Sequence, residues 1–153
     1  MANRPYVCGY DFGTLSCRIT VSDRSTGETV YEAGVDYPHG VISQQLPESD
    51  VVLGLDWALQ DPEDYLEVMT QLTRMALEKV APEEIAAIGT DFTNCTVVAL
   101  GADGRPLCMQ EKFRQTPHAW PKLWKHHAAQ PYAKRIEEIL TAENVDWFPL
   151  YGR

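Results

Sequence analysis

A short polar turn near the amino terminus carries the residues best suited to hold a phosphate group. A strand-like apolar run leads into an acid, a glycine, two hydroxyl side chains and a base: Asp11, Gly13, Thr14, Ser16 and Arg18. Glycine lets the backbone approach an anion closely, the hydroxyls can donate hydrogen bonds, and Asp11 can hold a magnesium ion through water. Arg18 can add a charge-assisted contact to a transferred group. The pattern is short, so it fits either a phosphate loop or an ordinary polar hairpin turn.

A second polar segment follows a later strand-like run. Asp91, Thr93 and Asn94 come at the end of residues 88–96, where an apolar strand passes into a turn. Carboxylate, hydroxyl and amide groups together supply the paired donors and acceptors that a polyol needs. The segment therefore predicts a sugar-binding edge, with a purely structural turn as the alternative.

A third segment, residues 123–130, contains Trp124, Lys125, His126 and His127. Two adjacent histidines on a helix point about 100° apart, which makes them a poor chelating pair and argues against zinc. Trp124 could form a flat apolar wall against a sugar, with Lys125 beside it as a donor. A buried core tryptophan followed by a solvated lysine is the competing interpretation.

The elements that must position these segments can be read from periodicity and turn residues. Alternation predicts strands at residues 6–11, 17–22 and 29–35, and residues 36–59 form an irregular excursion. Asp61 and Pro62 begin a helix whose apolar spacing runs to Val80. Further strands are predicted at residues 85–92 and 96–100, and a helix at residues 119–140, interrupted near Pro131. The order βββαββα indicates an α/β domain with a mixed sheet.

Composition restricts the possible partners. The formal net charge of -9 repels nucleic-acid backbones and anionic lipid surfaces. No apolar run approaches the roughly 20 residues that span a bilayer, and residues 1–5 lack a secretory signal, so a cytoplasmic protein is expected. The four cysteines, Cys8, Cys17, Cys95 and Cys108, form no Cys-x-x-Cys pair and are expected to be buried reduced thiols.

These motifs together resemble a known family. The Asp11 turn is similar to the first phosphate loop of the actin, hexokinase and sugar-kinase superfamily, and no Gly-Lys-Ser/Thr loop competes with it. Residues 88–96 resemble the sugar-lining segment of ribulokinases in the FGGY carbohydrate kinase family. The runs at residues 56–60 and 123–129 are typical of that branch rather than of glycerol or xylulose kinases. The likeness extends from Tyr10 to Tyr151.

The resemblance implies a fold and an activity. It implies a ribonuclease H-like, actin-like ATPase fold, a mixed sheet with flanking helices, in which residues 1–153 are an incomplete first domain on the sugar-binding side. On this resemblance the second, ATP-binding domain is expected to be absent from these 153 residues, and residues 147–153 resemble the middle of a family segment. The family's reaction moves the γ-phosphoryl group of MgATP to L-ribulose, giving L-ribulose 5-phosphate in arabinose breakdown. Asp11 and its turn would meet ATP and Mg²⁺, while Asn94 and Trp124 would line the sugar.

The family's general base lies in a later region, so no catalytic residue is assigned in this chain and the chain alone is expected to be inactive. Two other hypotheses stay open: a free-standing, non-catalytic sugar- or phosphate-binding module, and a kinase for another pentulose or a pentitol. Strands missing from the domain would expose apolar surface, which predicts self-association into a homo-oligomer.

Overall fold

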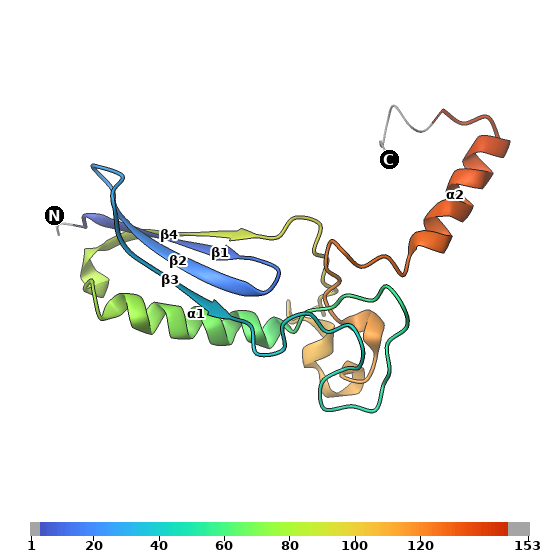
Figure 1. Ribbon diagram of the computed structural model, residues 1–153, viewed down its shortest axis with the longest axis horizontal. Helices are drawn as coiled ribbons and strands as arrows, with labels where there is room; N and C mark the ends of the chain where they lie inside the picture. Colours follow the sequence, from blue (N-terminus) through green and yellow to red (C-terminus); the bar gives the residue numbers. More distant parts are fainter. Residues whose placement is uncertain (1–3, 147–153) are drawn as a thin grey trace.

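The computed structural model describes residues 4–146, and its centre is a four-stranded sheet in the order β3-β2-β1-β4. The strands are β1 (Tyr6–Phe12), β2 (Ser16–Asp23), β3 (Thr29–Asp36) and β4 (Ile85–Phe92). β1 to β3 form an antiparallel meander, and β4 lies parallel to β1 after a crossover through α1 (Pro62–Leu77). The predicted mixed sheet is confirmed, and α1 covers one of its faces (Figure 1).

The core between the sheet and α1 follows from strand alternation and helical spacing. Every second residue of β1 and β2 faces the helix, and the helix presents one apolar stripe in return. The buried side chains are Cys8, Tyr10, Phe12, Cys17, Ile19, Val21, Val68, Leu72 and Ala76. On the opposite face the intervening residues, such as Asp11 and Arg18, are exposed. This leaves the charged residues of the first hairpin on the uncovered side of the sheet.

α1 begins where predicted, but it ends before Val80, the last residue of the predicted apolar spacing. The Asp61 carboxylate accepts a hydrogen bond from the Glu63 backbone N–H at 3.0 Å, as an N-cap should. The helix stops at Leu77, but Val80 stays buried. The backbone N–H groups of Lys79 and Val80 both donate to the Ala76 carbonyl, so Val80 belongs to the turn that closes the helix.

A second apolar cluster lies beyond the amino-terminal end of α1. It joins the excursion after β3 to a stretch of short 3-10 turns, η2 (Leu107–Met109), η3 (Glu111–Phe113) and η4 (Pro117–Ala119). Its buried side chains include Ile42, Leu46, Leu59, Cys108 and Trp120. Figure 1 shows these loops gathered at one end of the sheet-and-helix layer. A further 3-10 turn, η1 (Pro82–Glu84), connects α1 to β4.

Two sequence predictions are wrong. Residues 96–100 form no strand; they make only isolated bridges, Val97 with Lys122 and Leu100 with Pro106. Residues 120–129 form no α-helix, because several of their backbone groups pair with distant segments: Lys122 with Val97, Leu123 with Ala58 and His127 with Asp56. The last helix, α2, spans Gln130–Ala142, so Pro131 lies in its first turn, where proline is tolerated, and does not interrupt it.

α2 projects away from the sheet in Figure 1, and none of its residues is buried. Across residues 4–146, no helix has the length and apolar character that a bilayer crossing requires. The terminal segment 147–153, whose likeness to the middle of a family segment was noted above, lies outside the described residues.

Candidate functional site

The phosphate-loop candidate is the tight turn between β1 and β2. The Gly13 N–H donates to the Ser16 carbonyl at 2.9 Å. A Cβ at Gly13 would lie 3.1 Å from that same carbonyl oxygen, so the turn itself favours glycine here. The Thr14 and Leu15 carbonyls accept hydrogen bonds from Gln60 and Tyr37, both at 2.8 Å. Among the described residues, nothing occupies the backbone N–H groups of Thr14 and Leu15, so both are free to donate to an anion.

Three charged residues from the first and second predicted segments lie in one row across the sheet. Arg18 is opposite Asp11 in the antiparallel pair, and Asp91 is in register with Asp11 on the parallel strand β4. Residues in register point to the same face, so the two carboxylates are neighbours, with the guanidinium on the far side of Asp11. All three residues are exposed. The structure therefore brings Asp91, predicted for the sugar, beside Asp11, predicted for magnesium.

The polar turn after β4 is tied to the end of β1. The Thr93 N–H donates to the Phe12 carbonyl at 3.0 Å, and its hydroxyl lies 3.0 Å from that of Thr96. The Asn94 side-chain oxygen accepts a hydrogen bond from the Cys95 N–H at 2.9 Å, and the residue is exposed. This arrangement places the second predicted segment directly beside the first.

Trp124 connects the third predicted segment to the phosphate turn. Its indole Nε1–H donates to the Thr14 hydroxyl at 3.2 Å, although 110 residues separate the two in sequence. Trp124 lies in a loop and is 56% exposed, so the alternative of a buried core tryptophan is wrong. Lys125 follows it, half-buried, and no polar contact joins Lys125 to the turn within residues 4–146. The indole thus offers an open flat surface next to the free amides.

The loop that holds Trp124 is docked on the excursion that precedes α1. The Ala58 carbonyl accepts from the Leu123 N–H at 3.0 Å, and the Ala58 N–H donates to His126 Nδ1 at 3.2 Å. The His127 N–H donates to the Asp56 carbonyl at 2.9 Å. Burial, and then the nearby Lys122 charge, lowers the pKa of His126, which suits a ring nitrogen that must stay an acceptor. The runs at residues 56–60 and 123–129 are therefore one structural unit.

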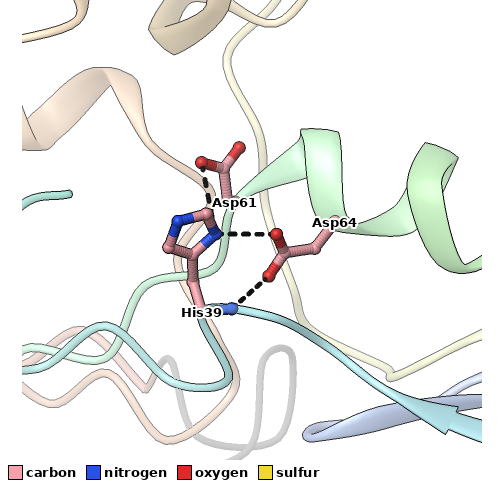
Figure 2. A group of neighbouring side chains, drawn as sticks. All are labelled: His39, Asp61 and Asp64. Atoms are coloured by element: carbon pink, nitrogen blue, oxygen red, sulfur yellow. Dashed lines mark hydrogen bonds and ion pairs between the residues drawn. The ribbon is translucent and has the colours of Figure 1, made fainter. Parts of the chain in front are cut away.

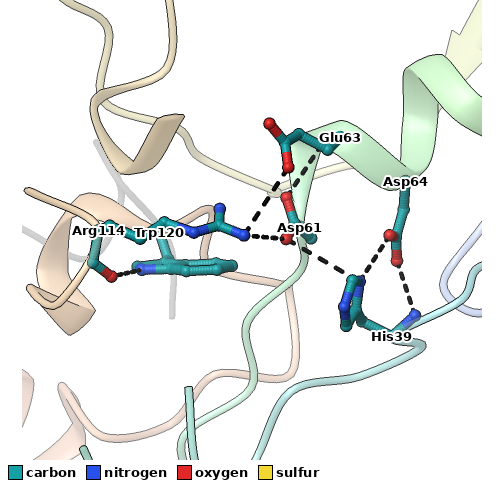
Figure 3. Close-up of polar contacts among 6 residues, drawn as sticks. All are labelled: His39, Asp61, Glu63, Asp64, Arg114 and Trp120. Carbon is teal, nitrogen blue, oxygen red and sulfur yellow. Dashed lines mark hydrogen bonds and ion pairs between the residues drawn. The ribbon is translucent and has the colours of Figure 1, made fainter. Parts of the chain in front are cut away.

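A charge network around two buried carboxylates, which the sequence did not indicate, anchors this unit to the start of α1. His39 contacts Asp64 twice, through Nδ1 at 2.7 Å and its backbone N–H at 3.0 Å, and its ring lies 3.9 Å from Asp61 (Figure 2). Asp61 also receives the Arg114 guanidinium at 3.3 Å, with Glu63 3.7 Å from the same nitrogen (Figure 3). The guanidinium lies over the Trp120 ring at 4.6 Å.

The His39, Asp61 and Asp64 side chains are close enough to be considered as metal ligands. Each of the four carboxylate oxygens, however, already accepts a hydrogen bond: from the Glu63 backbone, from Arg114, or from His39. The Arg114 guanidinium, a permanent cation, thus occupies part of the position that a metal ion would need. These contacts form a set of ion pairs between the two apolar clusters. Asp61 was predicted only as a helix cap, and His39 gave no signal because its partner lies 25 residues away.

The fold places the chain in a class of proteins. Solved sugar kinases share it: gluconate kinase from Lactobacillus acidophilus matches with a TM-score of 0.67 at 18% identity, covering 91% of this chain and 23% of that one. Ligand-bound xylulose kinase from the same organism matches with a TM-score of 0.67 at 18% identity, covering 91% of this chain and 24% of that one. Glycerol kinase from Plasmodium falciparum matches with a TM-score of 0.59 at 12% identity, covering 87% of this chain and 23% of that one. The chain has the fold of the amino-terminal part of these FGGY-type kinases.

Sequence comparison gives a more particular likeness. Ribulokinase from Geobacillus thermodenitrificans is 44% identical over 151 residues, covering 97% of this chain and 27% of that protein. Ribulokinase from Mycolicibacterium smegmatis is 44% identical over 150 residues, covering 96% and 27%. No protein-family profile matches the chain. The resemblance to ribulokinases is confirmed over nearly the whole chain, which spans about a quarter of the length of these relatives.

Proposed function

We propose that this chain is the amino-terminal, sugar-side part of an ATP-dependent kinase that phosphorylates L-ribulose to L-ribulose 5-phosphate in arabinose breakdown. One observation carries the proposal: the Trp124 indole is hydrogen-bonded to Thr14, so the candidate sugar wall adjoins the candidate phosphate turn. Phosphoryl transfer needs the acceptor hydroxyl held next to the transferred group. The names of the similar ribulokinases support the choice of sugar.

The geometry supports a division of roles. The free Thr14 and Leu15 N–H groups and the Thr14 and Ser16 hydroxyls would hold phosphate oxygens, and Arg18 would face the transferred group. Asp11 and Asp91 are neighbouring exposed carboxylates, which are the hard oxygen donors that Mg²⁺ prefers, directly or through water. Bound there with ATP, Mg²⁺ would neutralise charge on the phosphates.

The sugar side is assigned to the other two segments. Asp91, Thr93 and Asn94 would offer donors and acceptors to the hydroxyls of the ketose, with Trp124 as the flat wall and Lys125 as an additional donor. Asn94 would contribute its amide nitrogen, since its oxygen accepts from the Cys95 N–H. A base for the attacking hydroxyl is assigned to no residue of this chain, and we expect the chain alone to show no turnover.

A chimera tests the proposal directly. The first quarter of Geobacillus thermodenitrificans ribulokinase would be replaced by this chain, and ADP release would be followed with ATP and L-ribulose. We expect turnover from the chimera and none from the isolated chain. A folded chimera without turnover would refute the proposal, and turnover by the isolated chain would refute the assignment of the base. D-ribulose and ribitol as alternative acceptors test the sugar.

A pair of substitutions at Trp124 distinguishes its two contacts. In the chimera, Trp124→Phe keeps an aromatic wall but loses the N–H that bonds Thr14, whereas Trp124→Ala removes both. We expect Trp124→Ala to raise the KM for L-ribulose far more than Trp124→Phe does, because stacking area is what the sugar would contact. Equal KM values for both variants and the parent would refute the role as a sugar wall.

We also propose that the isolated chain self-associates. Large apolar side chains are exposed along α2 and on β4, which is an edge strand of the sheet: Ile88, Phe92, Tyr132, Ile136 and Ile139. An open strand edge beside apolar surface favours pairing with another chain. Light scattering should give a mass above that of one chain, rising with concentration. A single monomeric species at high concentration would contradict this proposal.

A further inference from the structure

Gln60 is a buried amide side chain that touches the phosphate turn from behind. Its exposed fraction is 1%. The side-chain Nε2 donates to the Thr14 carbonyl at 2.8 Å and lies 3.5 Å from the Gly13 carbonyl. Its Oε1 accepts from the Tyr65 hydroxyl at 2.6 Å. Both polar atoms of the Gln60 amide are thus hydrogen-bonded, and the nitrogen contacts only carbonyls of the turn.

Because the peptide bond is planar, the contacts of Gln60 also restrict the direction of the free Thr14 and Leu15 N–H groups. In a trans peptide the C=O of one residue and the N–H of the next point in opposite directions. The Gly13 carbonyl shares its peptide with the Thr14 N–H, and the Thr14 carbonyl shares its peptide with the Leu15 N–H. Because Gln60 draws both carbonyls toward the protein interior, both N–H groups are directed away from it.

Gln60 is itself held firmly in place. Its backbone N–H donates to the Pro121 carbonyl at 3.2 Å, which belongs to the loop that carries Trp124. The next residue, Asp61, is the fully buried cap of α1 and the partner of Arg114. A donor fixed in this way keeps the turn amides oriented before any ligand arrives, so they need not reorganise when it binds.

We propose that Gln60 is a positioning residue that directs the Thr14 and Leu15 amides toward the phosphate groups of the nucleotide. The inference rests on the proposed kinase function and adds a residue that does not itself contact substrate. Tyr65 has a supporting role, because its hydroxyl holds the Gln60 oxygen and leaves the side-chain nitrogen turned to the carbonyls.

Two variants and one control separate positioning from general stability. Gln60→Met keeps the length of the side chain and removes its donor. Tyr65→Phe keeps the aromatic ring and removes only the hydroxyl that orients Gln60. Leu72→Ala destabilises the core between α1 and the sheet at a fully buried position without touching the turn. The three variants would be compared at a temperature where all remain folded.

The first measurement uses the chain itself and needs no catalysis. Backbone ¹⁵N order parameters report whether the Thr14 and Leu15 amides are held rigidly. We expect Gln60→Met to lower both values, with a smaller decrease for Tyr65→Phe and no change at the turn for Leu72→Ala. Unchanged order parameters and chemical shifts at Thr14 and Leu15 in Gln60→Met would overturn the proposal.

The second measurement uses the chimera with ATP and L-ribulose. Misplaced phosphate donors should lower kcat by about ten- to a hundred-fold in Gln60→Met, while the KM for L-ribulose stays unchanged. A loss no greater than that of Leu72→Ala would overturn the positioning role. If the parent chimera shows no turnover, the proposed function fails, and the order parameters alone decide the role of Gln60.

Discussion

Replacing Asp61 by asparagine should reveal how much the charge network around this buried carboxylate contributes to stability. Asp61 is fully buried and does two things: one oxygen caps α1, and the other faces the Arg114 guanidinium at 3.3 Å. Asparagine caps helices about as well as aspartate, so Asp61→Asn retains the cap and removes the charge. Glu63→Gln is the matched control, because Glu63 approaches the same Arg114 nitrogen from an exposed position.

The expected magnitudes differ clearly. Removing one partner of a buried ion pair costs about 3–5 kcal/mol, because the remaining charge is left uncompensated. Arg114 would keep only Glu63, at 3.7 Å, and its side chain is 21% exposed, so we expect the lower end, about 3 kcal/mol. Asp61→Ala should cost about 1 kcal/mol more through the lost cap. Glu63→Gln removes an exposed pair and should cost about 0–1 kcal/mol.

Urea unfolding gives the free energies. Far-ultraviolet circular dichroism follows α1 and the sheet, and tryptophan fluorescence reports on the second cluster, since Arg114 lies over Trp120. A double-mutant cycle with Arg114→Met isolates the pair, because the two residues are in contact. We expect the double variant to be less destabilised than the sum of the two single variants.

Two results would refute this reasoning. If Asp61→Asn costs no more than Glu63→Gln, the buried pair contributes little beyond what an exposed contact does. If the two single losses simply add in the double variant, Asp61 and Arg114 are not energetically coupled, and the observed 3.3 Å contact carries no measurable interaction.

Three further outcomes are expected of the isolated chain. Leu72→Ala should lower the free energy of unfolding by about 2–5 kcal/mol, measured in urea, because the side chain is fully buried; a loss similar to that of an exposed residue would contradict the packing. The pKa of His126 is lowered in the folded chain, so its contribution to stability is present above the unfolded pKa of about 6.5 and is lost as pH falls. The urea midpoint of His126→Gln should therefore depend less on pH between about 5 and 7 than the midpoint of the parent chain. A thiol reagent should modify exposed Cys95 quickly under native conditions and leave Cys17 unmodified, because burial raises the pKa of Cys17 to about 11; similar rates at both would be inconsistent with the fold.

The regular elements of the sheet-and-helix layer were predictable from local patterns. Strands β1 to β4 and α1 begin and end within a few residues of their predicted limits. Alternating apolar residues specify which strand face is buried, and Asp61 followed by Pro62 specifies a helix start. Cysteine burial was predicted correctly at three positions, whereas Cys95 lies exposed in the turn after β4.

The errors fall where backbone groups find partners far along the chain. Residues 96–100 and 119–129 have apolar content that suits regular structure, yet the structure pairs Val97 with Lys122 in an isolated bridge. The Leu123 N–H bonds the Ala58 carbonyl in place of a neighbour in a helix. Local propensity is a weak guide when such long-range pairs satisfy the same hydrogen-bonding groups.

The residue types and spacing of the first hairpin predict phosphate chemistry without any tertiary information, because a strand delivering an acid into a glycine-containing turn is a local feature. Whether that turn lies beside Trp124, the proposed sugar wall, was decided by folding, which brings Trp124 to Thr14 across 110 residues. Gln60 and the network of His39, Asp61 and Arg114 likewise acquire their roles only through contacts between distant segments. Such contacts result from the packing of two apolar clusters, and one-dimensional periodicity carries no information about which distant side chains will meet.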